Sequence, residues 1–409
     1  MKHHTLWSKN FSLLIFASTL GSIGGIAGSY AMRFLVFDET GSTFAAGLLG
    51  AIQIVPYFLL PIIIAPWMDR MPRKPILVGG DLIGGVLYGI AGVYLHLFSF
   101  SYPGYLAFSL VVNCVNAFDS LAFTCIFPKT IPQGFEDKGY AVSAMLYPIM
   151  NVILMPVAAY LMDLIGVANI LMLQGGMSIL AAITENNIII EDTVMRKDGN
   201  GGFQRWFRDF KDGFRYLKGE KGLLRIYTYS AVTNGVSQGY GPILVAFFRS
   251  TPGFSAQLYA FFSAAEFVGR SIGGMMRYCT DMPPRKRRGF VYFVQQFYNA
   301  MDGILLWLPY PLMLINRGVC GFLGINSATV RESSIQQYLP EEYRARVNAF
   351  SEAAICAAGS VMSLLIGMMG EFVDYRIAIS VVAAVCGVIC WLTVGKDKGE
   401  LQKIYLNSK

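Results

Sequence analysis

The residues of this sequence that could do chemistry are ionisable side chains inside long apolar segments. Asp119 lies in the segment 104–127 without a basic residue within one helical turn, so its carboxyl group can bind and release a proton. Glu266 and Arg270 lie four residues apart in the segment 256–277, where a helix brings such a pair together. Charged groups are costly in lipid and commonly mark a proton or substrate path. We therefore expect proton coupling at Asp119, Glu266 and Arg270, with a purely structural ion pair as the alternative for the last two.

Polar residues recur on one face of four apolar segments, the first, fourth, seventh and tenth along the chain. Their spacings of three and four residues place them on one side of a helix, and that side should avoid lipid. The residues that we expect to line a substrate cavity are Ser22, Ser29, Arg33, Asn113, Asn116, Asp119, Asn234, Gln238, Asn326 and Arg331. For each Ser and Asn the alternative is hydrogen bonding between packed helices.

Long apolar segments must position these side chains. Of the 409 residues, 54% are hydrophobic and only 14% are charged, whereas a soluble domain averages roughly 25% charged residues. A helix that crosses a bilayer needs about 20 mostly apolar residues. Segments of this kind lie at residues 11–37, 43–66, 75–98, 104–127, 140–164, 168–190, 223–248, 256–277, 289–309, 312–337, 347–370 and 376–395. The sequence thus predicts an all-α membrane protein with about twelve transmembrane helices.

Lys and Arg residues gather in connections that fall on one side of the predicted spans. Basic clusters occur at residues 70–74, 285–288 and 344–346. No Lys or Arg occurs in the alternate connections near residues 38–42, 99–103, 166–168 and 310–311. Positive charge in short loops marks the cytoplasmic side. We therefore expect both termini in the cytoplasm and the chain in a plasma membrane, the inner membrane of a bacterium.

The stretch at residues 191–222, between the sixth and seventh predicted spans, is polar and basic. Aromatic residues such as Trp206, Phe210 and Phe214 recur there at mostly helical spacing among Lys and Arg. That pattern favours an amphipathic helix on the membrane surface, with anionic lipids as partners for the basic residues. The net charge of +7 does not indicate nucleic acid, because the basic clusters alternate with apolar segments instead of forming one patch.

The chain contains an internal repeat. Residues 132–143 match residues 340–351, each set between the fourth and fifth spans of its half, and residues 69–74 match residues 281–286. Parallel repeats are typical of transporters whose substrate site lies near mid-membrane between the halves. We expect a first bundle at residues 1–190, a cytoplasmic amphipathic linker at 191–222 and a second bundle at 223–409.

The repeated basic loop resembles a motif of the major facilitator superfamily. Asp69-Arg70, followed by Arg73 and Lys74, lies between the second and third spans and is similar to the core of that family's motif A. The segments 209–217 and 340–347 most resemble the macrolide-efflux-type branch of drug:proton antiporters, which also includes siderophore exporters. The resemblance implies two six-helix bundles around a central cavity, lined by the first, fourth, seventh and tenth helices.

The resemblance also implies a gate on the cytoplasmic side. In the family, the motif A acid caps the eleventh helix and pairs with basic neighbours, which holds the outward-facing state closed to the cytoplasm. The residues expected to gate by this resemblance are Asp69, Arg70, Arg73, Asp281, Arg285 and Glu352. The alternative is that these charges only orient the chain in the membrane.

Sequence signatures of zinc metalloproteases and ATP-driven pumps do not occur in the chain. There is no HExxH or Walker sequence, the chain has only three His, and its seven Cys include no CxxC pair. We therefore expect a protein that is not an enzyme and needs no cofactor or metal.

Together these features predict a secondary active transporter that works by alternating access. The leading hypothesis is proton-coupled export of an amphipathic small molecule, such as a drug, a macrolide or a siderophore-like compound, by a monomer. One alternative is uptake or flipping of an anionic or lipid-like substrate, with Arg33 or Arg331 binding its phosphate or carboxylate group. An alternative of another class is a channel or membrane receptor.

Overall fold

The computed structural model describes residues 5–68, 71–190, 202–280, 282–396 and 398–406. Within these ranges the chain is helical and contains no strand, and each of the twelve predicted spans corresponds to a helix. Six helices are long and apolar enough to cross a membrane by length and composition. The all-α membrane fold is therefore confirmed, and the count of twelve spans is confirmed in part.

The chain divides into two compact units. Unit 1 comprises Met1–Thr40 and Val55–Phe203, and unit 2 comprises Gly41–Ile54 and Gln204–Lys409. The division falls inside one helix, because Ile54 and Val55 are neighbours in α2 (Thr43–Met68). The predicted bundle boundaries near residues 190 and 223 stay a prediction.

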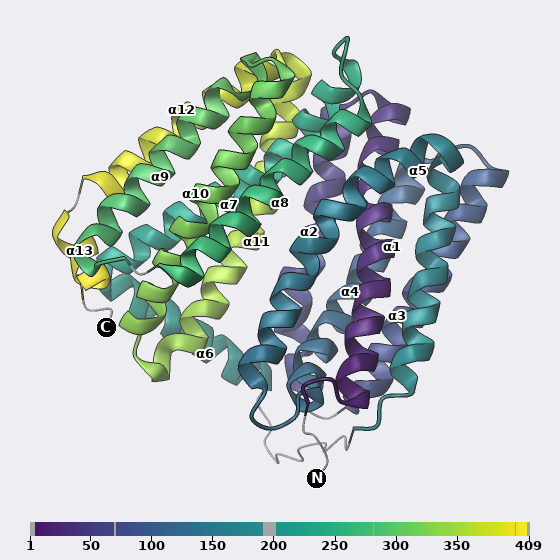
Figure 1. The fold of residues 1–409 in the computed structure, drawn as a ribbon, viewed down its shortest axis with the longest axis horizontal. Helices are drawn as coiled ribbons and strands as arrows, with labels where there is room; N and C mark the ends of the chain where they lie inside the picture. The colour runs from purple at the N-terminus through teal and green to yellow at the C-terminus, as the bar shows by residue number, and fades with distance from the viewer. Residues whose placement is uncertain (1–4, 69–70, 191–201, 281, 397, 407–409) are drawn as a thin grey trace. The chain divides into compact units, whose positions relative to one another are not determined.

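Unit 1 is built on one very long helical segment. Besides part of α2, its helices are α1 (Lys9–Thr40), α3 (Arg73–Leu97), α4 (Tyr102–Thr130) and α5 (Glu136–Asn186). Gly166 interrupts α5 with a φ of 79°, which divides it into two helices and matches the predicted connection at residues 166–168. Both α1 and α3 pack on α5 (Figure 1).

Small residues let these helices of unit 1 approach closely. A methyl group added at Gly85 would lie 2.8 Å from the carbonyl oxygen of Gly175, so α3 and the second part of α5 are nearly in backbone contact there. Gly24 of α1 meets Gln174 of α5 in a similar way, with 3.1 Å from the added methyl carbon to the Gln174 Cα. Such contacts are typical of membrane helices, which gain stability from close packing.

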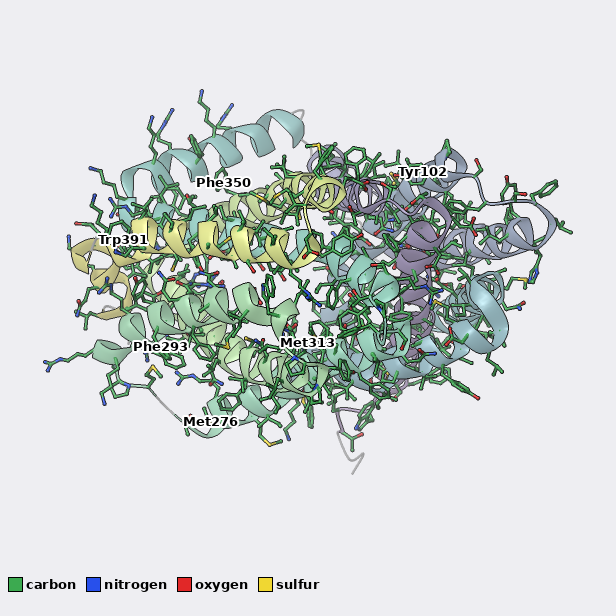
Figure 2. All side chains as sticks on the ribbon, turned by 90° about the horizontal axis from the view of Figure 1, so that it is seen from above. Tyr102, Met276, Phe293, Met313, Phe350 and Trp391 are labelled. Carbon is green, nitrogen blue, oxygen red and sulfur yellow. The ribbon has the colours of Figure 1, made fainter. Side chains whose placement is uncertain are left out.

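Unit 2 holds the remaining helices. They are α6 (Gly202–Gly219), α7 (Lys221–Ser250), α8 (Ala256–Cys279), α9 (Pro284–Ile304), α10 (Tyr310–Tyr338), α11 (Glu341–Phe372), α12 (Tyr375–Cys390) and α13 (Lys398–Leu406), with a 3₁₀ turn at Leu305–Trp307 and a π-helical turn at Trp391–Gly395. The closest helix pairs are α7 with α11, α8 with α10 and α9 with α12 (Figure 1). Met276, Phe293 and Trp391 stand on the outside of this unit (Figure 2), each more than 40% exposed. Exposed apolar side chains of this kind suit a surface that faces lipid.

The predicted amphipathic helix of the linker corresponds to α6. Its apolar side packs on unit 2, where Leu217 is fully buried and the ring of Tyr216 stacks on that of Tyr343 with 4.5 Å between centroids. Its basic residues Arg215 and Lys218 are exposed. This separation of apolar and basic faces confirms the helix, while its contact with lipid stays a prediction.

The first part of α2 packs on α11 inside unit 2. Thr43 Oγ1 donates to the Gly367 carbonyl oxygen at 2.7 Å, and Ser363 Oγ donates to the Gly47 carbonyl oxygen at 3.0 Å. The carboxylate of Glu371 caps the start of α2, because its Oε1 accepts from the Phe44 N–H at 2.8 Å and from the Ser42 hydroxyl at 2.7 Å. We call this contact the α2–α11 seam.

Candidate functional site

A cavity of about 190 Å³ lies in unit 2, between α7, α9 and α10. Its lining residues on α7, such as Asn234 and Ser237, fall near the middle of that helix. Hydroxyl and amide side chains dominate the lining: Tyr229, Thr233, Asn234, Ser237, Tyr240, Gln295, Tyr298, Asn299 and Ser327. Three charged residues, Arg270, Asp302 and Arg331, complete it. We call this space the central cavity of unit 2.

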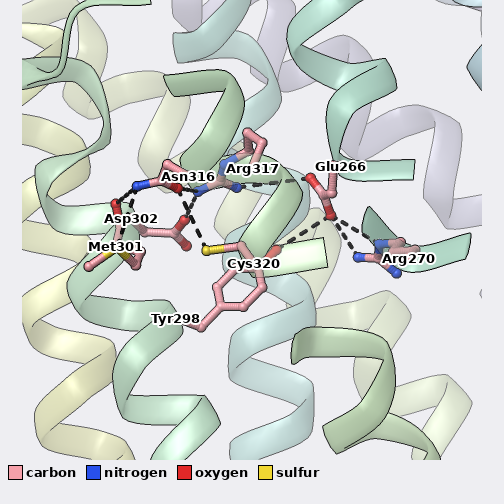
Figure 3. Close-up of polar contacts among 8 residues, drawn as sticks. All are labelled: Glu266, Arg270, Tyr298, Met301, Asp302, Asn316, Arg317 and Cys320. Atoms are coloured by element: carbon pink, nitrogen blue, oxygen red, sulfur yellow. Dashed lines mark hydrogen bonds and ion pairs between the residues drawn. The ribbon is translucent and has the colours of Figure 1, made fainter. Parts of the chain in front are cut away.

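An ion-pair network with a buried centre at Arg317 and Asp302 lies beside the central cavity (Figure 3). Arg317 of α10 donates to Asp302 of α9, and both residues are less than 10% exposed. The Arg317 Nη1 also lies 3.9 Å from Glu266 Oε2 on α8. Glu266 in turn accepts from Arg270 Nη2 at 2.8 Å and from the Tyr298 hydroxyl at 3.4 Å. The helix-local pair of Glu266 and Arg270 that the sequence predicted is therefore present, as part of a larger network.

Aromatic rings complete the environment of Arg317. Its guanidinium carbon lies 5.6 Å from the centroid of Phe262 and 5.7 Å from that of Tyr298. Stacking on aromatic faces suits a weakly hydrated guanidinium better than a lysine ammonium. A charge this deep requires partners, because an unpaired buried ion is very costly. The network therefore holds α8, α9 and α10 in register around the central cavity.

A second cavity of about 180 Å³ adjoins the first at Arg331. It lies between α7, α10 and α11, and Asn234 and Arg331 line both cavities. Glu332 and Glu352 also line it, and Glu332 accepts from Gln336 at 2.7 Å. Arg331 thus lies between the central cavity of unit 2 and the second cavity, which has two carboxylates in its lining.

Three carboxyl groups lie near one another in unit 1. Asp81 of α3, Asp119 of α4 and Glu185 at the end of α5 interact electrostatically. Glu185 is only 3% exposed, and its Oε2 and the Asp119 Oδ1 are buried without a hydrogen-bond partner. The absence of a side chain at Gly80 lets α3 approach Asp119, since an added methyl carbon would lie 3.0 Å from the Asp119 Cβ. In the part of the chain that the structure describes, no basic side chain pairs with these three acids.

The remaining predicted cavity residues of unit 1 lie on α1 and α4. Ser29 and Arg33 are exposed within the unit, and Ser22 is half-buried. Asn113 donates to the Ser109 carbonyl oxygen of its own helix at 2.8 Å. Asn116 lies near tyrosine hydroxyls on α2 and α3. Their role in a substrate cavity stays a prediction.

In unit 2 the structure brings some of the predicted cavity residues together and separates others. Asn234 and Arg331 share the lining of both cavities. Asn326, by contrast, is buried between α8 and α10, where it donates to the Gly273 carbonyl oxygen at 3.1 Å, as in the alternative of helix packing. The Gln238 side chain lies against Gly359 of α11.

The residues that the resemblance assigned to a gate are only partly described. Asp69, Arg70 and Asp281 lie outside the described residues. Arg73 is the first residue of α3, and Arg285 lies exposed near the start of α9. Glu352 is in the lining of the second cavity of unit 2. Gating by these residues stays a prediction.

Sequence reasoning missed Arg317 and Glu185. A signal existed for Arg317, because a charged residue inside a span needs a partner and the neighbouring span carries Asp302, which the sequence shows only as an isolated acid. Glu185 was missed because it lies at the predicted end of a span, where an acid is unremarkable on hydropathy alone.

Comparison with known families decides the kind of protein. The sequence model described as Major Facilitator Superfamily matches residues 11–295, which is more than half of the chain. The chain belongs to the major facilitator superfamily. As a member of this superfamily it is a membrane protein and a transporter.

A curated relative matches most of the chain at low identity. Macrolide efflux protein A of Streptococcus pyogenes is 22% identical over 382 residues, which cover 89% of this chain and 86% of that protein. Both chains therefore match over nearly their whole length.

Solved transporters of the superfamily share the fold. A bacterial homolog of the human lysosomal transporter Spinster is 15% identical with a TM-score of 0.69, and the match covers 97% of this chain and 96% of that one. The nucleoside transporter NupG is 11% identical with a TM-score of 0.73, covering 95% of this chain and 99% of that one. A POT family transporter solved with 5-aminolevulinic acid is 11% identical with a TM-score of 0.69, covering 93% and 94% of the two chains.

Proposed function

We propose that this superfamily member exports an amphipathic small molecule in exchange for protons. The observation that carries the proton part is the group of three acids in unit 1, Asp81, Asp119 and Glu185, which no described basic side chain neutralises. Carboxyl groups inside a membrane protein commonly serve as proton relays. The similarity to a macrolide efflux protein supports export and an amphipathic substrate.

The proposed cycle follows alternating access. Two halves of the transporter expose a substrate site first to one side of the membrane and then to the other. Asp119 takes up a proton from outside and releases it to the cytoplasm, and this downhill step drives the outward movement of the substrate. Asp81 and Glu185 act as neighbours between which the proton moves, because their charges interact with that of Asp119.

The test is transport in proteoliposomes with an imposed pH gradient. Radiolabelled erythromycin serves as the macrolide, and pyranine inside the vesicles reports the proton flux. We expect coupled fluxes of both species in the wild type, and we expect Asp119→Asn to abolish proton-driven accumulation. Asp163→Asn provides the matched control, because it makes the same change at an exposed acid of α5.

Two outcomes bear directly on the proposal. Drug movement that continues in Asp119→Asn and in the presence of a protonophore contradicts proton coupling. Gradient-driven movement only into the compartment that corresponds to the cytoplasm favours uptake and contradicts export.

We further propose that the protein works as a monomer in a bacterial inner membrane with both termini in the cytoplasm. The basic clusters of the connecting loops support this orientation. Membrane-impermeant thiol labelling of single cysteines at Arg285 and at Ser101 in intact cells tests it. We expect protection at Arg285 and labelling at Ser101, and the reverse result would contradict the orientation.

A further inference from the structure

We propose that the central cavity of unit 2 binds the carboxylate or phosphate group of an anionic small molecule, with Arg331 as its cationic partner. The inference rests on the proposed function in that the bound molecule is taken to be the transported substrate. It adds a chemical class of substrate that the erythromycin assay does not cover, amphipathic molecules with a negative charge at one end.

Arg331 stands out because it lacks a counter-ion. Within the described residues it makes no ion pair or hydrogen bond, although it lies inside the long helix α10 and lines two cavities. An arginine in this position is costly unless it finds an anion. Its planar guanidinium has donors arranged to bind carboxylate or phosphate oxygens in pairs.

The other charges around the central cavity are already balanced. Arg270 is paired with Glu266, and Arg317 is paired with Asp302. The network therefore contributes two cations and two anions, and its net charge is zero. Arg331 alone gives this space a positive charge, so an anion is favoured there and a cation is not.

The uncharged lining suits the oxygens of such an anion. Hydroxyl and amide groups of Thr233, Asn234, Ser237 and Ser327 line the cavity beside Arg331 and can donate hydrogen bonds. The volume of about 190 Å³ is below the roughly 300–1,000 Å³ of pockets that hold drug-sized ligands. The cavity therefore fits the charged end of an amphipathic molecule and not the whole of it.

The second cavity offers carboxylates toward which Arg331 can turn, although it forms no ion pair with them among the described residues. Glu332 and Glu352 line that space together with Arg331. A flexible arginine on the shared wall can turn toward these carboxylates or toward a bound anion. Substrate binding would then hold Arg331 at the central cavity, away from Glu352 in the first half of α11.

Equilibrium dialysis of the purified full chain tests the proposal without a gradient. The probes are radiolabelled benzoate and phenyl phosphate, with benzamide as the uncharged match for benzoate. We expect both anions to bind and benzamide to bind at least tenfold more weakly. Arg331→Gln should weaken benzoate binding at least tenfold, Arg331→Lys should retain part of it, and Lys403→Gln should leave it unchanged because Lys403 is an exposed residue of α13.

A second variant guards against a folding defect in Arg331→Gln. Ser237→Asp keeps Arg331 and places a carboxylate in the same lining, so it should abolish benzoate binding. Equal affinity for benzoate and benzamide in the wild type would overturn the proposal, as would unchanged benzoate binding in Ser237→Asp. Binding of lysophosphatidate without binding of benzoate or phenyl phosphate would also overturn it, because the site would then belong to a lipid headgroup.

The outcomes separate this inference from the proposed function. Anion binding without proton-coupled export leaves the site assigned and contradicts the transport cycle. Proton-coupled export of erythromycin without anion binding supports the cycle and contradicts the assignment of the cavity.

Discussion

A disulfide across the α2–α11 seam should stop transport. A methyl carbon added at Gly50 would lie 3.9 Å from the Cβ of Ser363, and disulfides join Cβ atoms that are about 3.5–4.5 Å apart. The double variant Gly50→Cys/Ser363→Cys should therefore form the bond on mild oxidation without a shift of either helix. Because α2 continues beyond Ile54 into unit 1, we expect the movement of alternating access to open this seam.

The assay combines thiol counting with transport. After oxidation with copper phenanthroline and denaturation, maleimide-polyethylene glycol should tag two fewer thiols in the double variant than in its reduced form, against a background of the seven native cysteines. Proton-driven transport should fall to the background of empty vesicles and return after reduction with dithiothreitol. The single variants Gly50→Cys and Ser363→Cys should respond to neither reagent.

Two results would refute the reasoning. Full transport by the cross-linked protein would mean that the seam stays closed throughout the cycle and that α2 moves with unit 2 as one body. Failure to form the bond, with both cysteines reactive and the protein folded, would mean that α2 and α11 do not pack in this register.

Three further predictions concern stability, measured by thermal unfolding with a thiol-reactive dye that reports exposure of the buried cysteines. Arg317→Met should lower the free energy of unfolding by about 3–5 kcal/mol, because it leaves the buried carboxylate of Asp302 unpaired. Adding Asp302→Leu should recover much of that loss. A double variant that loses as much stability as the two single variants together would contradict the pairing. Gly273→Ala should destabilise because its new methyl group would lie 2.5 Å from a carbonyl oxygen of α10, whereas Gly274→Ala, with nothing within 4 Å, should be neutral or stabilising; equal effects would contradict the close contact. Glu371→Gln should lower the free energy of unfolding by about 1 kcal/mol, because it weakens the cap at the start of α2. An unchanged melting temperature would show that this cap does not stabilise the protein.

The helices could be predicted from the sequence because each span carries its own signal. Length and hydropathy placed every predicted span on a helix, and the change from apolar to basic residues located α6. The division of α2 between two units could not be predicted in this way. It depends on Gly47, Gly50, Ser363 and Gly367 lying against each other, and small residues in one helix do not indicate which distant helix they meet.

The candidate site was predictable only in its individual parts. Inward-facing polarity singled out Asn234 and Arg331, which line cavities of unit 2, and helical spacing predicted the pair of Glu266 and Arg270. The connection of this pair through Arg317 needed three helices to pack at one depth. Hydropathy contains no information on that packing, because it treats each helix alone.

The membership of Gly41–Ile54 in unit 2 also matters for dissecting the protein. A fragment that starts in the linker would lack these residues and would leave the serine and glycine face of α11 uncovered, with Glu371 deprived of the helix end it caps. Separately expressed halves should therefore be unstable alone and recover when they are produced together. Dividing the gene between the two halves of the repeat therefore separates the first part of α2 from α11, on which it packs.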